Sequence, residues 1–155
     1  MKSMRFFSLS VLFFIGVLCA DAHKIIAPVS IGELFDKITI LEIKMNYFTN
    51  PAQRVNVQQE LTLLKQTVTD SQIIAPEITT QLEQLISQLR ETNKKLWDIE
   101  DAIRAKEAKK EFDTAFITLA RSVYFTNDER CRIKRAINEL AGSTLIEEKQ
   151  YTEYA

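Results

Sequence analysis

The feature of this sequence that most constrains its fold is a run of apolar residues spaced four and three apart between residues 78 and 103. This heptad spacing keeps one stripe of a helix facing a partner helix. The pattern predicts a long central helix over about residues 76–110, opened by a proline and ended by a basic pair. The stripe, which we call the central seam, consists of Ile78, Leu82, Leu85, Leu89, Thr92, Leu96, Ile99 and Ile103.

Two shorter helices are predicted before the central one. Ser30 with Glu33 three residues later forms a capping box for a helix that runs to about residue 48. Asn50 followed by Pro51 indicates a second helix start, which extends to about Asp70. The short joint between them favours an N-terminal antiparallel helix hairpin. The expected inward residues are Ile31, Leu34, Phe35, Ile38, Leu41, Met45 and Phe48, then Val57, Leu61, Leu64 and Val68.

Two more helices are predicted after the central one, giving an all-α bundle of about five helices. The fourth spans residues 112–125 and ends at Thr126-Asn127, where a second capping signal opens a fifth helix over residues 128–141. Gly142 marks its end, and residues 143–155 form a C-terminal tail. The expected inward residues are Phe112, Phe116, Leu119, Ala120 and Val123, then Ile133, Ile137 and Leu140.

The N-terminus has the pattern of a cleavable secretory signal. Lys2 and Arg5 precede a mostly apolar run over residues 6–18, and Ala20-Asp21-Ala22 supplies a small-x-small cleavage site. The apolar run is shorter than the ~20 residues that span a bilayer, so an uncleaved anchor is less favoured. We predict a signal peptide over residues 1–22, cleavage after Ala22, export to the periplasm or medium, and a single helical domain over residues 23–155.

The composition of the mature chain excludes several classes of partner. Without Lys2, Arg5 and Asp21, the 20 basic and 21 acidic residues become 18 and 20, a formal charge of −2. Such a balance gives no strong field for nucleic acid or an anionic membrane. Only Cys131 survives cleavage, so no intramolecular disulfide can form, and we predict no membrane span after cleavage.

Most metal and nucleophile chemistry is excluded by the same counts. His23 is the single histidine, which leaves neither a His/Cys metal set nor a triad base inside the fold, and we expect no cofactor. A redox role for Cys131 stays open beside the simpler interpretation of a buried small apolar residue. No two glycines lie close enough to form a phosphate loop.

Two charged groups are the candidate sites. The first, expected to be a structural ion-pair and aromatic cluster on the outer face of the central helix, comprises Trp97, Asp98, Glu100, Asp101 and Arg104. The second, a hypothetical anion site at the start of the fifth helix, comprises Arg121, Asn127, Arg130 and Lys134. We expect these groups to pair across neighbouring helices, with Trp97 beneath the ion pairs, because ion-pair networks imitate functional sites.

Three long motifs resemble those of an uncharacterised bacterial family, a domain of unknown function. They read GELFDKITILEIK, LWDIEDAIR and LARSVYFTNDERCRIKRAIN, and together with the closing GS…EEKQY they cover residues 28–151 in the family's order. The resemblance implies no activity. Members of that family usually begin just before the first motif and have no export signal. The N-terminal extension of this chain departs from that pattern. If the family shares a site, the matching positions are Glu33, Asp36, Lys37, Trp97, Asp98, Glu100, Asp101, Arg104, Arg121, Asn127, Asp128, Arg130 and Lys134.

The sequence therefore favours a small exported helical-bundle protein that acts by binding or assembly, without catalysis of its own. An anion-binding module centred on the fifth helix is the alternative from the residues. A metal-free helical enzyme similar to the all-α chorismate mutases is a weaker one, because no specific motif supports it. A homodimer through the central helix also stays open, since bundles and coiled coils share the heptad pattern.

Overall fold

The computed structural model describes residues 25–150 of the chain, so the predicted signal peptide and the last five residues lie outside it. The described part is all-helical, with no strand. Four α-helices and one short 3-10 turn follow in order: α1 (Ile31–Tyr47), α2 (Pro51–Ser71), η1 (Pro76–Ile78), α3 (Thr79–Lys109) and α4 (Thr114–Leu140). Within residues 25–150, every helix falls short, in length or apolar character, of what crossing a bilayer requires.

The helix starts are fixed by the caps that the sequence indicated. Ser30 accepts a hydrogen bond from the backbone N–H of Glu33 at 3.2 Å, and Asn50 accepts from Ala52 at 2.9 Å. The Glu33 side chain does not complete the capping box, because it binds Lys134 on α4 instead. Asp113, which the sequence analysis did not single out, caps α4 by accepting from Phe116 at 2.9 Å.

The prediction of five helices is wrong at one junction, because α4 continues through Thr126 and Asn127 without a break. Thr126 is buried, and its hydroxyl donates to the carbonyl of Ser122 at 2.7 Å within the same helix. A threonine that bonds one turn back is compatible with a helix interior as well as with a cap. Thr126 therefore has the residue type of a helix cap, but its burial keeps it inside a continuous helix.

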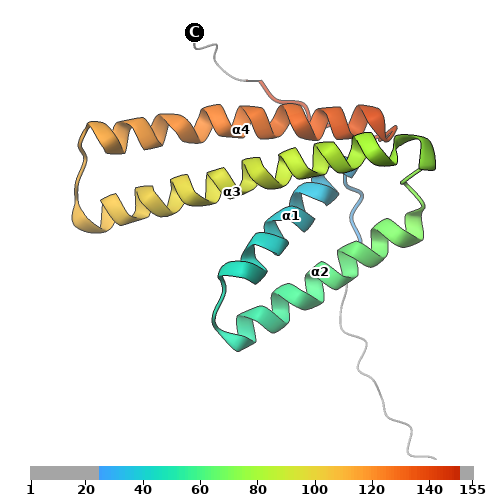
Figure 1. Cartoon of the computed structure of the whole chain (residues 1–155), viewed down its shortest axis with the longest axis horizontal. Helices are drawn as coiled ribbons and strands as arrows, with labels where there is room; N and C mark the ends of the chain where they lie inside the picture. Colours follow the sequence, from blue (N-terminus) through green and yellow to red (C-terminus); the bar gives the residue numbers. More distant parts are fainter. Residues whose placement is uncertain (1–24, 151–155) are drawn as a thin grey trace, which may run out of the picture.

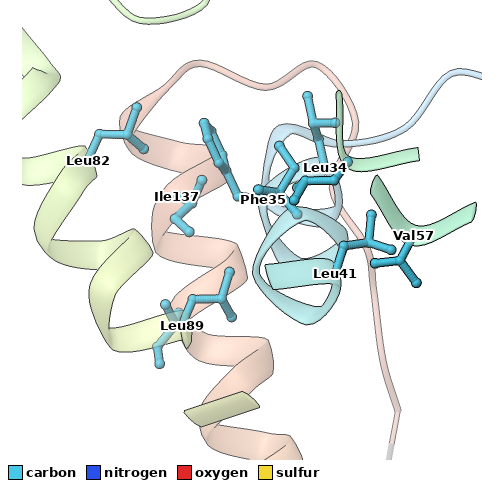
Figure 2. Close-up of a cluster of buried hydrophobic side chains, with 10 residues drawn as sticks. Leu34, Phe35, Leu41, Val57, Leu82, Leu89 and Ile137 are labelled. Atoms are coloured by element: carbon cyan, nitrogen blue, oxygen red, sulfur yellow. The ribbon is translucent and has the colours of Figure 1, made fainter. Parts of the chain in front are cut away.

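The core lies where α1 meets the other three helices. Figure 1 shows α3 and α4 side by side along their length, with α1 against one end of the pair and α2 packed on α1. Figure 2 shows the apolar side chains that fill this end, among them Leu34, Phe35, Leu41, Val57, Leu82, Leu89 and Ile137. The central seam is therefore used inside the molecule, with Leu82, Leu89, Leu96 and Ile99 buried.

Beyond the end of α1, α3 and α4 continue as a pair with no third helix on them (Figure 1). We call residues 100–125 of this pair the arm. No residue of the arm is buried, whereas the body of the molecule holds the whole core cluster. Two helices alone can cover only the stripe that each turns toward the other, so their remaining faces stay in solvent.

Candidate functional site

Two charged residues of the described chain, Lys134 and Asp36, are buried, and they lie at the junction of α1 and α4. The Lys134 side chain is only 7% exposed, and its ammonium pairs with Glu33 of α1 and, at 2.8 Å, with Glu147 of the tail. The buried carboxylate of Asp36 lies 4.0 Å away. A buried cation is tolerated only where carboxylates surround it, and this one has three within reach.

Asp36 is held in turn by α3. The amide nitrogen of Asn93 donates to Asp36 at 2.7 Å and to the hydroxyl of Thr39 at 2.9 Å, and that hydroxyl donates to the Asp36 carbonyl. All three side chains are buried. Lys134, Asp36 and Asn93 thus join α4, α1 and α3 through one polar network, which we call the junction.

Gly32 explains how α1 approaches α4 so closely. Its N–H donates to the side-chain oxygen of Asn138 at 2.6 Å. A Cβ at this position would lie 2.5 Å from the backbone oxygen of Lys134, closer than side-chain carbons come to such atoms. The first motif therefore needs glycine here for close helix packing rather than for a left-handed turn.

The tail continues the junction along α4. After Gly142, whose φ of +65° ends the helix, Glu147 pairs with Lys134 and Glu148 with Arg135 at 3.4 Å. Lys149 contacts the Cys131 sulfur at 2.8 Å. A cavity of about 180 Å³ lies between α4 and the tail, lined by Cys131, Arg132, Lys134, Arg135, Asn138, Glu147, Glu148 and Lys149. Its charges already pair with one another, so an anion would have to displace a tail carboxylate.

The protonation of this region follows from its pairing. Burial by itself lowers the pKa of Lys134, but hydrogen bonds with Glu147 and Glu33 outweigh it and raise that pKa above its usual value. The hydrogen bond from Lys134 lowers the pKa of Glu147. The contact with Cys131 raises the pKa of Lys149. Lys134 and Glu147 therefore hold opposite charges across the neutral pH range.

The four residues of the hypothetical anion site do not come together. Arg121 and Lys134 lie thirteen residues apart on one continuous helix, which separates them by about 20 Å. Arg121 lies on the arm and donates to the Tyr124 hydroxyl at 3.3 Å, whereas Asn127 is half-buried nearer the body. The free N–H groups expected at a fifth helix start do not exist, because the helix does not begin there. The site as we defined it is therefore corrected, and Lys134 belongs to the junction.

The acidic residues of α3 pair differently from the prediction. Asp98 pairs with Lys94, and Glu100 and Asp101 share Arg104 at 2.8 and 3.8 Å, all within α3. The expected pairing with cations of α4 is wrong. These side chains are about half exposed or more, so they form surface pairs one turn apart rather than an interhelical network.

Trp97 lies against α1 rather than under the ion pairs. Its ring centroid is 5.3 Å from that of Tyr47 and 6.4 Å from that of Phe48, where α1 ends. Trp97 therefore packs on the end of α1, where the body of the molecule meets the arm.

Three buried polar atoms have no hydrogen-bond partner among residues 25–150: Trp97 Nε1, Asn93 Oδ1 and Arg130 Nε.

The arm carries exposed apolar residues, two of which, Phe112 and Ala120, were predicted to face inward. Phe112 is 57% and Ile117 is 55% exposed, and Ala120 is also exposed. The prediction that Phe112 and Ala120 face inward is wrong. Phe112 lies in the turn between α3 and α4, and no third helix of residues 25–150 covers the part of α4 that carries Ala120. The prediction rested on the spacing of apolar residues along the helix, and such spacing does not distinguish a buried face from an uncovered one.

The described residues offer no cluster of metal ligands, and Cys131 does not lie at a helix start. Among residues 25–150, no three His, Cys, Asp or Glu side chains group closely enough to hold a metal ion. Cys131 is half-buried in the interior of α4, not at a helix start as the five-helix prediction had it.

The comparison with family models gives one match. A family of unknown function, DUF6165, matches residues 25–154, which confirms the resemblance that the motifs indicated. No curated protein and no solved structure shows significant similarity to the chain.

Proposed function

The chain belongs to the family of unknown function DUF6165, and we propose that it acts by binding and assembly through its arm rather than by catalysis. The observation that carries this proposal is the exposure of large apolar side chains on a two-helix projection. Isolated apolar residues on a surface are ordinary, but a group of them on one projecting element marks an interaction site.

The arm adds little to the stability of the fold, so its presence is not explained by the packing of the body. No residue between Glu100 and Phe125 is buried, so this segment contributes little hydrophobic stabilisation to the body. Its turn is nevertheless well braced, since Lys106 reaches from α3 to Glu111 at 2.9 Å and to Asp113 at 2.8 Å. A projection with exposed apolar side chains is suited to presenting a helical surface to a partner.

The junction supports a structural role more than a catalytic one. A helical enzyme of the chorismate-mutase kind needs cations inside the bundle that are available to a substrate. Lys134 is instead engaged by Glu33 and Glu147, and Asp36 by Asn93. Each of these groups links two segments of the chain, which accounts for their placement without a substrate.

A photo-crosslinking residue in place of Ile117 tests the proposal in the native cell. Leu63 on α2 is the matched control, because it is 53% exposed against 55% for Ile117. It also belongs to a helix whose Val57 and Leu61 are buried in the core. We expect adducts of discrete mass from position 117 and none from position 63. Absence of adducts at both positions, with the protein folded and expressed, would count against an assembly role.

A second candidate function, anion binding, rests on the cavity between α4 and the tail. Lys134, Arg135 and Lys149 line it together with Glu147 and Glu148. If the cavity takes anions, phosphate should raise the melting temperature more in the double variant Glu147→Gln, Glu148→Gln than in the parent protein. An equal shift in both proteins would remove this candidate.

Export is also part of the proposal, and it rests on the sequence of residues 1–22 alone. The charged start, the short apolar run and the Ala20-Asp21-Ala22 site support it. N-terminal sequencing of protein recovered outside the cytoplasm should begin at His23. Intact Met1 in that fraction would contradict cleavage.

A further inference from the structure

Among residues 25–150, the buried polar atoms that lack a hydrogen-bond partner all lie close to the junction. Two belong to Asn93 and Trp97, which are one turn apart on α3, and the third is Nε of Arg130 on α4. Buried polar groups of folded proteins are almost always hydrogen-bonded, and an unpaired one is destabilising. Three such atoms in one part of the molecule therefore indicate a shared binding partner.

The contacts of the junction fix where these atoms lie. Asn93 donates to Asp36 at 2.7 Å, and Asp36 lies 4.0 Å from the Lys134 ammonium, so α3 and α4 meet there. The two helices run antiparallel (Figure 1), so one turn from the junction toward the arm leads to Trp97 on α3 and to Arg130 on α4. The two N–H donors therefore lie at the same level, beside the end of α1 that packs on the Trp97 ring.

The orientation of Asn93 leaves its oxygen unpaired. Its amide nitrogen donates to the Asp36 carboxylate at 2.7 Å and to the Thr39 hydroxyl at 2.9 Å. A carboxylate only accepts, and the Thr39 hydroxyl donates its own hydrogen to the Asp36 carbonyl, so both groups require the nitrogen of Asn93. Asn93 Oδ1 therefore remains a free acceptor, on a residue that is only 4% exposed.

Arg130 is half-buried and forms neither an ion pair nor a hydrogen bond with residues 25–150. The basic residues that follow it differ in this respect, because Arg132 pairs with Glu129 and Lys134 with Glu33. Removal of a guanidinium from water is unfavourable unless an acceptor replaces the lost hydration, and an anionic acceptor does so best. The placement of Arg130 is therefore explained by an anion other than the side chains of residues 25–150.

We propose that Arg130 and Trp97 bind a small oxyanion, a carboxylate or phosphate group, beside the end of α1. The Arg130 guanidinium offers Nε–H and an Nη–H in the fork that holds two oxygens of one anion. The indole N–H of Trp97 acts only as a donor and supplies a further hydrogen bond. Asn93 Oδ1 accepts a hydrogen from the same ligand, such as that of a neighbouring hydroxyl or of a protonated phosphate. This oxyanion site, formed by Asn93, Trp97 and Arg130, goes beyond the proposed assembly function and does not depend on it.

The oxyanion site is separate from the cavity under the tail. Arg130 is not among the residues that line that cavity, whereas Arg132 is. Arg132 is exposed and pairs with Glu129, so it provides a control of the same residue type two positions away. Replacing each arginine by glutamine therefore distinguishes the two possible places of an anion.

Nuclear magnetic resonance of the purified full chain tests the site directly. Trp97 is the single tryptophan, so its indole N–H gives one resonance. During titration with sodium phosphate or sodium acetate, at an ionic strength held constant with sodium chloride, we expect the Trp97 indole and Arg130 Nε–H resonances to shift saturably with one dissociation constant. A response to phosphate alone identifies a phosphate group as the ligand, and a response to acetate alone identifies a carboxylate. No saturable shift with either probe, or a shift of only one of the two resonances, would overturn the proposal.

The variants separate binding from a structural role of Arg130. In sodium chloride buffer alone, Arg130→Gln should unfold at the same temperature as the parent protein or a higher one, because it removes an unpaired buried charge. The same variant should bind the active probe about tenfold more weakly or worse, measured by Trp97 fluorescence, whereas Arg132→Gln should bind it unchanged. An Arg130→Gln protein that is destabilised or unfolded in that buffer would show that Arg130 is structurally paired and would contradict the site. Loss of binding in Arg132→Gln instead would assign the anion to the cavity under the tail.

Discussion

Gly32 shows how much of this fold depends on single atoms. The first turn of α1 lies against the backbone of α4, and a Cβ on Gly32 would lie 2.5 Å from the oxygen of Lys134 and 3.0 Å from that of Asn138. The nearer atom belongs to a helix backbone, which cannot move without shifting the junction. The constraint is a contact between distant parts of the chain, so the sequence alone identified the helix start but not the reason for its glycine.

Replacement of Gly32 by alanine should therefore destabilise the protein, although alanine is the better helix former. We expect a loss of about 1–3 kcal/mol in the free energy of unfolding, measured by urea denaturation. Gly142→Ala is a useful contrast, since no atom lies within 4 Å of its Cβ and only its positive φ opposes the change. An alanine at position 32 that leaves the unfolding midpoint unchanged would contradict the close approach.

Lys134 and Arg135 are neighbours whose replacement should have very different effects. Lys134→Met leaves the buried Asp36 without its cation, so we expect a loss of about 3–5 kcal/mol in the free energy of unfolding. Arg135 is half exposed and pairs with exposed carboxylates, so Arg135→Met should cost less than about 1 kcal/mol. Equal effects in thermal and urea unfolding would argue against a buried junction.

At the scale of the elements, the sequence predicted helices better than their boundaries with one another. The caps at Ser30 and Asn50, and the length of α3, follow from local signals and are confirmed. The break at Thr126 is wrong, because a local capping signal there competes with burial against α3, which the sequence does not display. The pairing of Glu33 with Lys134, more than one hundred residues away, also has no local signal.

The tail is the element whose attachment should depend most on pH. The lowered pKa of Glu147 means that its pairing stabilises the attached tail above about pH 4.3, the value of a free glutamate, and is lost as the pH falls through the lowered pKa. The raised pKa of Lys134 preserves the pair up to about pH 10.4 and beyond, until the pH passes the raised pKa.

Nuclear magnetic relaxation of residues 145–149 can measure this attachment. We expect the heteronuclear Overhauser effect of the tail amides to be high at pH 7 and to fall near pH 3. Glu147→Gln should lower it at pH 7 as well, whereas Glu148→Gln should not, because Glu148 is more exposed and its pair is longer. A tail equally ordered in all four conditions would show that the ion pair does not hold it.

At the scale of the whole molecule, the division into a body and an arm was not visible in the sequence. The same apolar periodicity runs through both halves of α4, yet α1 reaches only one of them, as Figure 1 shows. Periodicity predicts that a face is apolar, and the length and direction of the other helices decide whether that face is covered. The arm is therefore the part of the molecule where sequence and structure together point to a partner.

Hydroxyl-radical footprinting compares the solvent access of two side chains that are equally exposed in a single copy of the chain. Ile117 on the arm and Leu63 on α2 are 55% and 53% exposed. If the arm is the surface through which the protein assembles, oxidation of Ile117 should be severalfold lower in the native cell than in the dilute purified protein, while oxidation of Leu63 is the same in both. Equal oxidation of Ile117 in the cell and in the dilute purified protein would contradict the account.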